Sequence, residues 1–153
     1  EFMDFAIRRR TGYLDALAAR GITPDPQLMF SDEMTEISGY RATQTMLALP
    51  QPPTAILCSS MISGMGARRA VESAGLTVGR EVSIIIHDDD LSYMKNGEDV
   101  PIFTATRSSV REAGRLTAEM LLGLIAHPED TPQQRLLEAE LIIGQSTGPV
   151  LKA

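Results

Sequence analysis

The sequence predicts an α/β fold, a Rossmann-like layered parallel sheet flanked by helices. Short apolar β-runs alternate with helical segments, and two of these runs, 54–58 and 82–86, are joined by a helical segment over 62–74 that Gly75 closes. A strand, a crossover helix and a second strand form a βαβ unit, whose strands lie parallel in one sheet. Polar residues follow both runs. Open α/β sheets bind ligands beyond the carboxyl ends of their strands, so a binding site is expected there.

The N-terminal part is predicted to hold two helices. Apolar residues at helical spacing predict a helix over 5–20, which Gly21 ends. A proline-marked turn leads to a short β-run at 28–30, and a polar, acidic loop follows it. The second helix is expected over 38–49, because prolines directly after it cannot continue a helix.

Two further strands are predicted in the C-terminal part. Residues 103–106 alternate as a strand does, and residues 136–143 form the last β-run. A long polar loop over 88–100 separates the first of these strands from the βαβ unit.

A long helix over 110–126 lies between these two strands. Ser108 or Ser109 can cap it, and Glu112 follows Ser109 at the spacing of a capping box. This helix carries a wide apolar face, which is typical of a helix that covers a sheet. The predicted strands of this chain are few, so we expect the sheet that this helix covers to belong to chain missing from this sequence.

Composition narrows the possible functions. The 153 residues are 43% hydrophobic with a formal net charge of −6, as in an ordinary soluble domain with no electrostatic reason to bind nucleic acid or acidic membranes. Cys58 lies in an apolar run, so we expect a buried thiol in a cytoplasmic protein. We expect no membrane segment, and no signal peptide because arginines 8–10 follow the apolar residues. Residues 1–2, Glu-Phe before Met3, resemble a cloning remnant.

An ordered series of short motifs resembles the LacI/GalR family of bacterial transcription regulators. Each motif is weak by itself, but their order and spacing agree across almost the whole chain. The motifs are Arg8-Arg9-Arg10-Thr-Gly-Tyr, Ser38-Gly-Tyr, Pro53-Thr-Ala-Ile, Gly64-Met-Gly-Ala, Ala74-Gly-Leu, Val82-Ser-Ile, Asp88-Asp89 and Pro101-Ile-Phe-Thr-Ala-Thr-Arg-Ser.

The resemblance implies an effector-binding core of the type I periplasmic-binding-protein-like fold, with a small molecule between two α/β subdomains. Residues 3–153 would be a partial effector-binding domain, mainly its C-terminal subdomain, without the family's helix-turn-helix. Residues 108–127 would be a helix of the missing N-terminal subdomain. The resemblance further implies a homodimer that uses helix 62–74 and the loop leading to Pro101, DNA contact only through the absent domain, no cofactor and no enzymatic activity.

Five residues are candidates for contacting a sugar-like effector. Asp88 leaves a strand end, and a carboxylate accepts two directed hydrogen bonds, which suits adjacent hydroxyls. Its position matches the family's sugar-contacting aspartate. The motif match places Arg9, alone among its triplet, in the effector position, where its planar fork suits hydroxyls or carboxylates. Ser60 stands where the family has an effector-contacting Asn. Arg107 is a candidate ligand clamp, and Met34 a candidate cleft residue.

The chain departs from the family pattern at two places near the expected cleft. Ser60-Met61 stands where the family usually shows Asn-Asp, and Ile86-His87 where Gly-Tyr or Gly-Phe commonly precedes the Asp pair. These changes affect the identity of the effector more than the fold.

Other functions remain as alternatives. The two histidines, His87 and His127, lie far apart in the sequence, which argues against a metal site. A hydrolase would need Ser59 or Ser60 to combine with His87 and Asp88, but no nucleophile-elbow pattern surrounds these serines. A periplasmic-type sugar-binding protein of a transporter would share the fold and the cleft, and differs only in its partner.

Overall fold

The computed structural model describes residues 3–90 and 93–150, so the expected remnant at residues 1–2 lies outside the described part. None of the helices in these residues is long and apolar enough to cross a membrane. In chain order the elements are α1 (Asp4–Ala18), the 3-10 helix η1 (Pro26–Leu28), α2 (Glu36–Leu47), β1 (Ala55–Cys58), α3 (Met61–Ser73), β2 (Ser83–Asp88), β3 (Thr104–Arg107), α4 (Val110–Ala126) and β4 (Glu140–Ile142).

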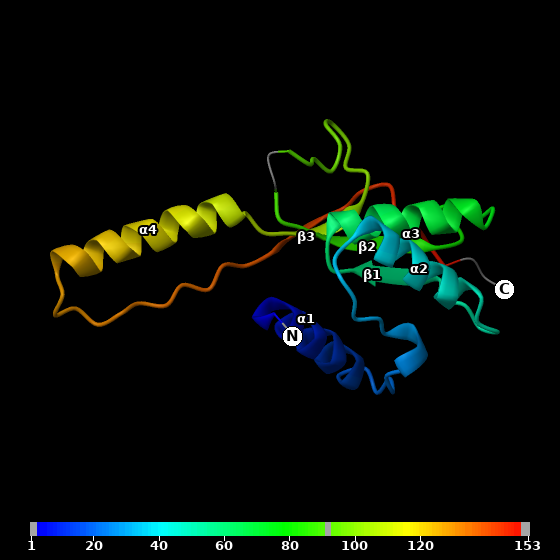
Figure 1. Cartoon of the computed structure of the whole chain (residues 1–153), viewed down its shortest axis with the longest axis horizontal. Helices are drawn as coiled ribbons and strands as arrows, with labels where there is room; N and C mark the ends of the chain where they lie inside the picture. Colours follow the sequence, from blue (N-terminus) through cyan, green and yellow to red (C-terminus); the bar gives the residue numbers. More distant parts are fainter. Residues whose placement is uncertain (1–2, 91–92, 151–153) are drawn as a thin grey trace.

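The sheet confirms the predicted α/β class and the βαβ unit. Four strands lie in the order β1-β2-β3-β4, and β1, β2 and β3 run parallel (Figure 1). The crossover from β1 to β2 runs through α3, as the spacing of the β-runs predicted. Because β1, β2 and β3 are parallel, their carboxyl ends meet at one edge of the sheet.

The hydrophobic core lies between this sheet and the α2–α3 pair. Alternate residues of β2 are buried, and Ile84 and Ile86 are wholly inaccessible together with Val71 of α3. The two helices approach closely because glycine stands at their contact: a Cβ atom on Gly66 would overlap the backbone carbonyl of Glu36. A side chain at this point would push α2 away from α3 and open the core.

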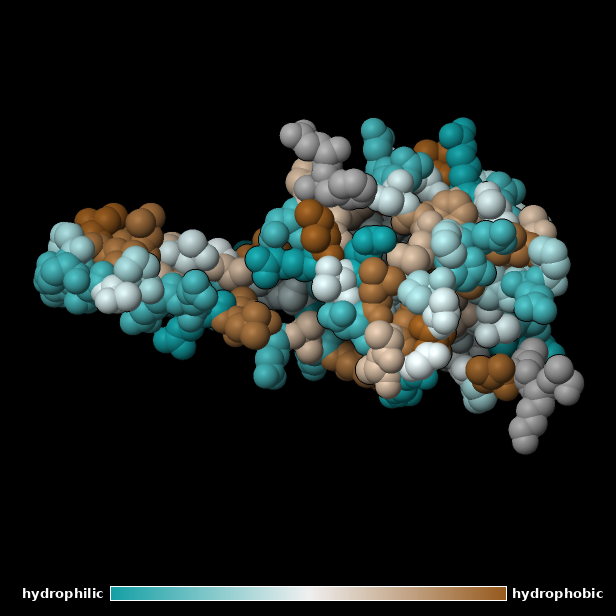
Figure 2. All heavy atoms as spheres, turned by 90° about the horizontal axis from the view of Figure 1, so that it is seen from below, coloured by the Kyte–Doolittle hydropathy of each residue, from teal (hydrophilic) through white to brown (hydrophobic). Residues whose placement is uncertain are grey.

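The first and last helices lie apart from this core. Neither α1 nor α4 has a buried residue. In Figure 1, α4 and the extended segment after it project from the sheet as a long arm. Apolar surface gathers on this arm in Figure 2, and it includes Leu121, Leu122 and Ile125, each more than half exposed. Within the described residues, α4 buries none of its side chains against the sheet.

Two predicted strands differ from the structure. The predicted β-run at 28–30 is wrong: Pro26 starts a 3-10 turn, and the Asp25 carboxylate accepts the backbone N–H of Gln27. Proline at the first position and an acidic cap favour a helical turn over extension. The last strand is shorter than the predicted 136–143, because only β4 pairs with the sheet, and it runs antiparallel to β3.

Local side-chain contacts set the ends of the segments that flank the sheet. Ser109 caps α4 by accepting the backbone N–H of Glu112, and the Glu112 side chain turns to Arg115 instead of completing the capping box. In the loop before β3, the buried Asn96 amide both donates to and accepts from the backbone of Phe103, with both contacts at 2.8 Å. This anchor fixes the entry into β3.

Candidate functional site

Polar side chains collect where the three parallel strands end. Asp88 is the last residue of β2 and lies in register with Arg107, the last residue of β3. The Arg107 guanidinium donates to Oδ2 of Asp88 from Nη2 at 3.1 Å and from Nε at 3.3 Å. The backbone N–H of Asp90 donates to the other carboxylate oxygen, Oδ1, at 2.9 Å. Both oxygens of Asp88 therefore have partners within the chain.

The burial of Asp88 follows from strand alternation. Its side chain shares the inward face of β2 with Ile84 and Ile86 and is only 4% exposed, whereas its partner Arg107 is 33% exposed. A carboxylate at such a position must be paired and hydrogen-bonded, since an unpaired buried charge is strongly unfavourable. The ion pair with Arg107 meets that requirement. It also places the partly exposed guanidinium of Arg107 at the carboxyl ends of the strands.

Helix α1 reaches the same place through Arg9. Its Nη1 donates to the backbone carbonyl of Ser59, just past the end of β1, at 2.7 Å, and its Nη2 lies 3.8 Å from Oδ1 of Asp89. The guanidinium also stacks over the Phe5 ring at 5.0 Å. Within the arginine triplet, Arg8 pairs with an exposed aspartate of its own helix instead. Arg9 is thus the member of the triplet that meets the strand ends.

His87 and Asp89 complete this group. Nε2 of His87 lies 3.0 Å from Oδ1 of Asp89 and 3.2 Å from Oγ of Ser108, while Nδ1 lies 3.0 Å from Oγ1 of Thr106. Burial lowers the pKa of His87 below its usual value, and the charge of Arg9 lowers it further, against a smaller opposing effect of the aspartates.

We call Arg9, His87, Asp88, Asp89 and Arg107 the strand-end cluster. Its two arginines and two aspartates form two ion pairs, Asp88 with Arg107 and Asp89 with Arg9. Fixed donors and acceptors of both signs, gathered at one edge, suit a neutral ligand with many hydroxyl groups, since each hydroxyl both donates and accepts.

Two of the five predicted site residues have other surroundings. Ser60 caps α3: its hydroxyl accepts the backbone N–H of Ser63 at 3.3 Å and contacts the Ser63 hydroxyl at 2.9 Å. Met34 lies in the loop before α2 with 45% of its surface exposed. The structure therefore brings together Arg9, Asp88 and Arg107 from the predicted set. For all five, a role in binding stays a prediction.

Sequence reasoning left His87 and Asp89 out of the predicted site. The signal for His87 is a polar residue on the outward face of an otherwise apolar strand, in register with the polar Thr106 of the next strand. The signal for Asp89 is its place directly after the buried Asp88, since it is the first side chain beyond the strand. The Ser59 carbonyl that binds Arg9 belongs to the backbone and leaves no mark in the sequence.

The hydrolase alternative lacks its geometry. A catalytic triad needs the acid on one imidazole nitrogen and the nucleophile on the other. The nitrogens of His87 contact Asp89 and Ser108 at Nε2 and Thr106 at Nδ1, and not the predicted nucleophiles, of which Ser60 instead contacts Ser63 through its hydroxyl. Within the described residues, no group of three or more His, Cys, Asp or Glu side chains is arranged to hold a metal ion.

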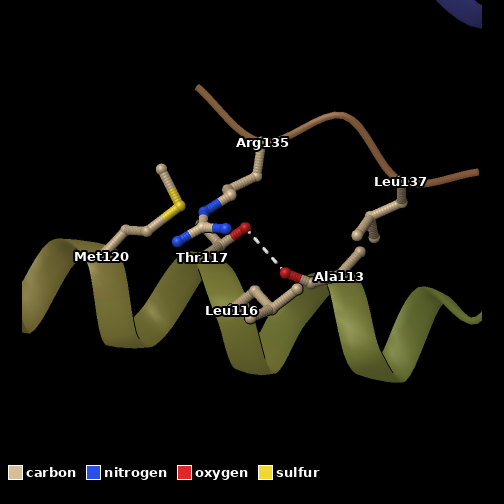
Figure 3. Close-up of a pocket in the computed structure, with 6 residues that line it drawn as sticks. All are labelled: Ala113, Leu116, Thr117, Met120, Arg135 and Leu137. Carbon is tan, nitrogen blue, oxygen red and sulfur yellow. Dashed lines mark hydrogen bonds between the residues drawn. The ribbon is translucent and has the colours of Figure 1, made fainter. Parts of the chain in front are cut away.

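Two hollows lie away from the strand-end cluster. One, of about 150 Å³, is on the arm between α4 and the segment that follows it, where Arg135 lies over Thr117 and Leu137 lies beside Ala113 (Figure 3). The other, of about 260 Å³, lies between the C-terminal ends of α2 and α3. No residue of the strand-end cluster lines either of these two hollows.

Comparison with known proteins agrees with this architecture. The model of the periplasmic binding protein-like domain family matches residues 3–147. The chain belongs to this family. A curated relative, the HTH-type transcriptional regulator AglR of Rhizobium meliloti (strain 1021), is 47% identical over 97% of this chain and 42% of its own length.

Solved structures give the same result. A LacI family transcriptional regulator from Bifidobacterium animalis subsp. lactis matches 95% of this chain and 51% of its own with a TM-score of 0.81 and 27% identity. A structure described as a CelR–cellobiose complex matches 92% of this chain and 42% of its own with a TM-score of 0.78 and 27% identity.

These relatives confirm the LacI-type resemblance that the motifs indicated, together with the periplasmic-binding-protein-like fold. They are transcriptional regulators rather than enzymes. The chain spans less than half the length of the curated relatives it matches.

Proposed function

We propose that this chain forms one wall of the effector site of a LacI-type transcriptional regulator, and that the effector is a small polyhydroxylated molecule. The observation that carries the proposal is the strand-end cluster, where Asp88, Arg107 and Arg9 from three separate elements converge at the aligned ends of parallel strands. This edge is where open α/β sheets bind their ligands. A relative described in complex with cellobiose supports a carbohydrate.

The mechanism we propose involves no bond making or breaking. The effector binds between this wall and a second subdomain and favours one arrangement of the two. Only a difference in effector affinity between the two arrangements can shift their populations, and that shift changes DNA binding by a separate helix-turn-helix domain. The regulator would act in the cytoplasm as a homodimer through α3 and the loop leading to Pro101. It would bind DNA only through that separate domain and contact no membrane.

In this proposal the arm belongs to the second subdomain. α4 leaves the sheet directly after β3, buries none of its residues and exposes apolar side chains along its length. A helix of this kind is stable when another layer covers its apolar face. We therefore assign residues 108–127 to the opposite side of the cleft, with β3 as a crossing strand.

A transporter's sugar-binding protein would share this fold and this site. The curated relatives are named as HTH-type regulators, which favours the regulator. A coding sequence for a helix-turn-helix upstream of this chain in its gene supports the regulator, and a signal peptide there supports the transporter.

The experiment is calorimetric titration of the intact protein with a panel of mono- and disaccharides that includes cellobiose. For a sugar that binds, Asp88→Ala is expected to weaken affinity by about 1–3 kcal/mol, the usual cost of an unpaired buried polar group. Glu72→Ala is the control, because Glu72 pairs with Arg68 at the exposed surface of α3. Unchanged affinity in Asp88→Ala contradicts the proposed site, and no binding by any sugar of the panel contradicts the proposed effector class.

A further inference from the structure

His87 stands where three elements of the site meet. It lies on the outward face of β2, its ring faces Thr106 of β3 on one side, and on the other it faces Asp89, which in turn lies next to Arg9 of α1. Its side chain is 17% exposed, whereas those of Asp89 and Arg9 are about one-third exposed, at 34% and 32%. The imidazole is thus the inner member of a row whose outer members meet solvent.

The contacts of His87 to Asp89 and Thr106 together fit a proton on Nε2. The Asp89 carboxylate, 3.0 Å from Nε2, can only accept a hydrogen bond, so a bond between them requires the proton on Nε2, with the Ser108 hydroxyl at 3.2 Å from the same nitrogen. In a neutral imidazole Nδ1 is then an acceptor, and the Thr106 hydroxyl, 3.0 Å away, donates to it. The charged groups that face the ring are Arg9 from α1, Asp88 at the end of β2, Asp89 directly after it, and Arg107 of β3 through its pair with Asp88.

This arrangement restrains Asp89. The residue follows the last position of β2, so the sheet ladder no longer holds its backbone. Its carboxylate oxygen Oδ1 lies between Nε2 of His87 at 3.0 Å and Nη2 of Arg9 at 3.8 Å. A long, partly exposed ion pair has little energy of its own to hold both side chains in one geometry. The shorter contact to His87 is the stronger restraint.

We propose that His87 is a positioning residue of the effector site: its Nε2–H group holds the Asp89 carboxylate beside Arg9, so that both present a fixed donor and acceptor to the effector. This inference rests on the proposed function. It also explains why a histidine suits this position. An aromatic ring that lacks the Nε2–H donor would not restrain Asp89. Fixed polar groups bind a ligand more tightly than mobile ones because less ordering is lost on binding.

The contact can be tested without any effector. The chain has two histidines, and His127, 67% exposed on its side chain, serves as the reference in ¹⁵N NMR of the imidazole nitrogens. We expect the Nε2–H tautomer at His87. Asp89→Asn should lower the pKa of His87, because Asp89 raises it, and Arg9→Gln should raise that pKa, because Arg9 lowers it. The opposite tautomer, or a His87 titration that neither variant moves, overturns the proposal.

The role in binding is tested on the intact protein with cellobiose as the probe. His87→Gln keeps an N–H donor near the Nε2 position, whereas His87→Phe keeps a ring and removes both nitrogens. We expect His87→Phe to weaken binding about tenfold and His87→Gln to stay within about threefold of the unmodified protein, as for loss and retention of one hydrogen bond to a charged group. Equal affinities of His87→Phe and the unmodified protein, or equal losses in both variants, overturn the positioning role. If the unmodified protein does not bind cellobiose, that result counts against the proposed effector, while the NMR titration still decides the contact.

Discussion

The ion pair between Asp88 and Arg107 gives a direct test of the strand-end cluster in the unliganded chain. Asp88→Asn removes the charge while it keeps the size of the side chain, and Arg107→Gln removes the charge of the partner. The two variants and their double variant form a thermodynamic cycle, which isolates the interaction between the two side chains from the other effects of each substitution.

The expected coupling energy follows from burial and geometry. Asp88 is 4% exposed, but Arg107 is 33% exposed, so the pair lies between surface pairs, worth about 0–1 kcal/mol, and buried pairs, whose loss costs about 3–5 kcal/mol. The two contacts, at 3.1 and 3.3 Å, are longer than the best charge-assisted hydrogen bonds. We therefore expect a coupling of about 1–2 kcal/mol.

The assay is urea unfolding of the 153-residue chain followed by circular dichroism. The pair Arg68–Glu72 on α3 is the control cycle, because its side chains are 46% and 51% exposed and its coupling should stay below about 0.5 kcal/mol. A coupling between Asp88 and Arg107 no larger than that of the control would refute the argument. Such a result would mean that the pairing of β2 with β3 does not hold the charges of Asp88 and Arg107 together in solution.

Three further results are expected from the same chain. Gly66→Ala should destabilise it by about 1–3 kcal/mol in urea, because the new Cβ meets the backbone carbonyl of Glu36, whereas Gly114→Ala, where a Cβ meets nothing within 4 Å, should be neutral or stabilising. Folding lowers the pKa of His87 from 6.5, so the unfolded chain binds more protons, and stability that is complete above pH 6.5 should decline below it. If the urea midpoint of His87→Phe falls as much as that of the unmodified chain between about pH 7.5 and about pH 5.5, His87 is not the cause of the pH dependence. Burial raises the pKa of Cys58 to about 12, so its thiol should resist a disulfide reagent in the folded chain and react in urea; rapid reaction without urea would contradict its burial.

Local signals were sufficient for most of the elements. Short apolar runs mark β1 and β2, and Gly75 closes the helix between them. Ser109 caps α4 as expected, because a cap depends on residues three apart in the chain. The prediction failed at η1, where a short apolar run outweighed the stronger signal of an acidic cap followed by proline. It overextended β4 because the apolar pattern continues beyond the residues that pair with β3.

The place of the strand-end cluster was predictable from the sequence, whereas its internal contacts were not. A polar residue after a buried strand must lie at the sheet edge, so the position of Asp88 follows from the pattern around it. Its pairing with Arg107 depends on strand register, and the contact of Arg9 with the Ser59 carbonyl joins residues 50 apart in the chain. Neither the register nor the placement of α1 is written in a local pattern.

The sequence alone determined the α/β layers, the edge at which polar groups gather, and the helix of the arm whose apolar face has no partner among the described residues. Only the tertiary structure decided that His87 lies against Asp89, that Asp89 lies beside Arg9, and that Ser60 serves as a helix cap. The reason is physical: periodicity and capping act over a few residues, while a hydrogen bond across a sheet edge requires the packing that brings distant segments together.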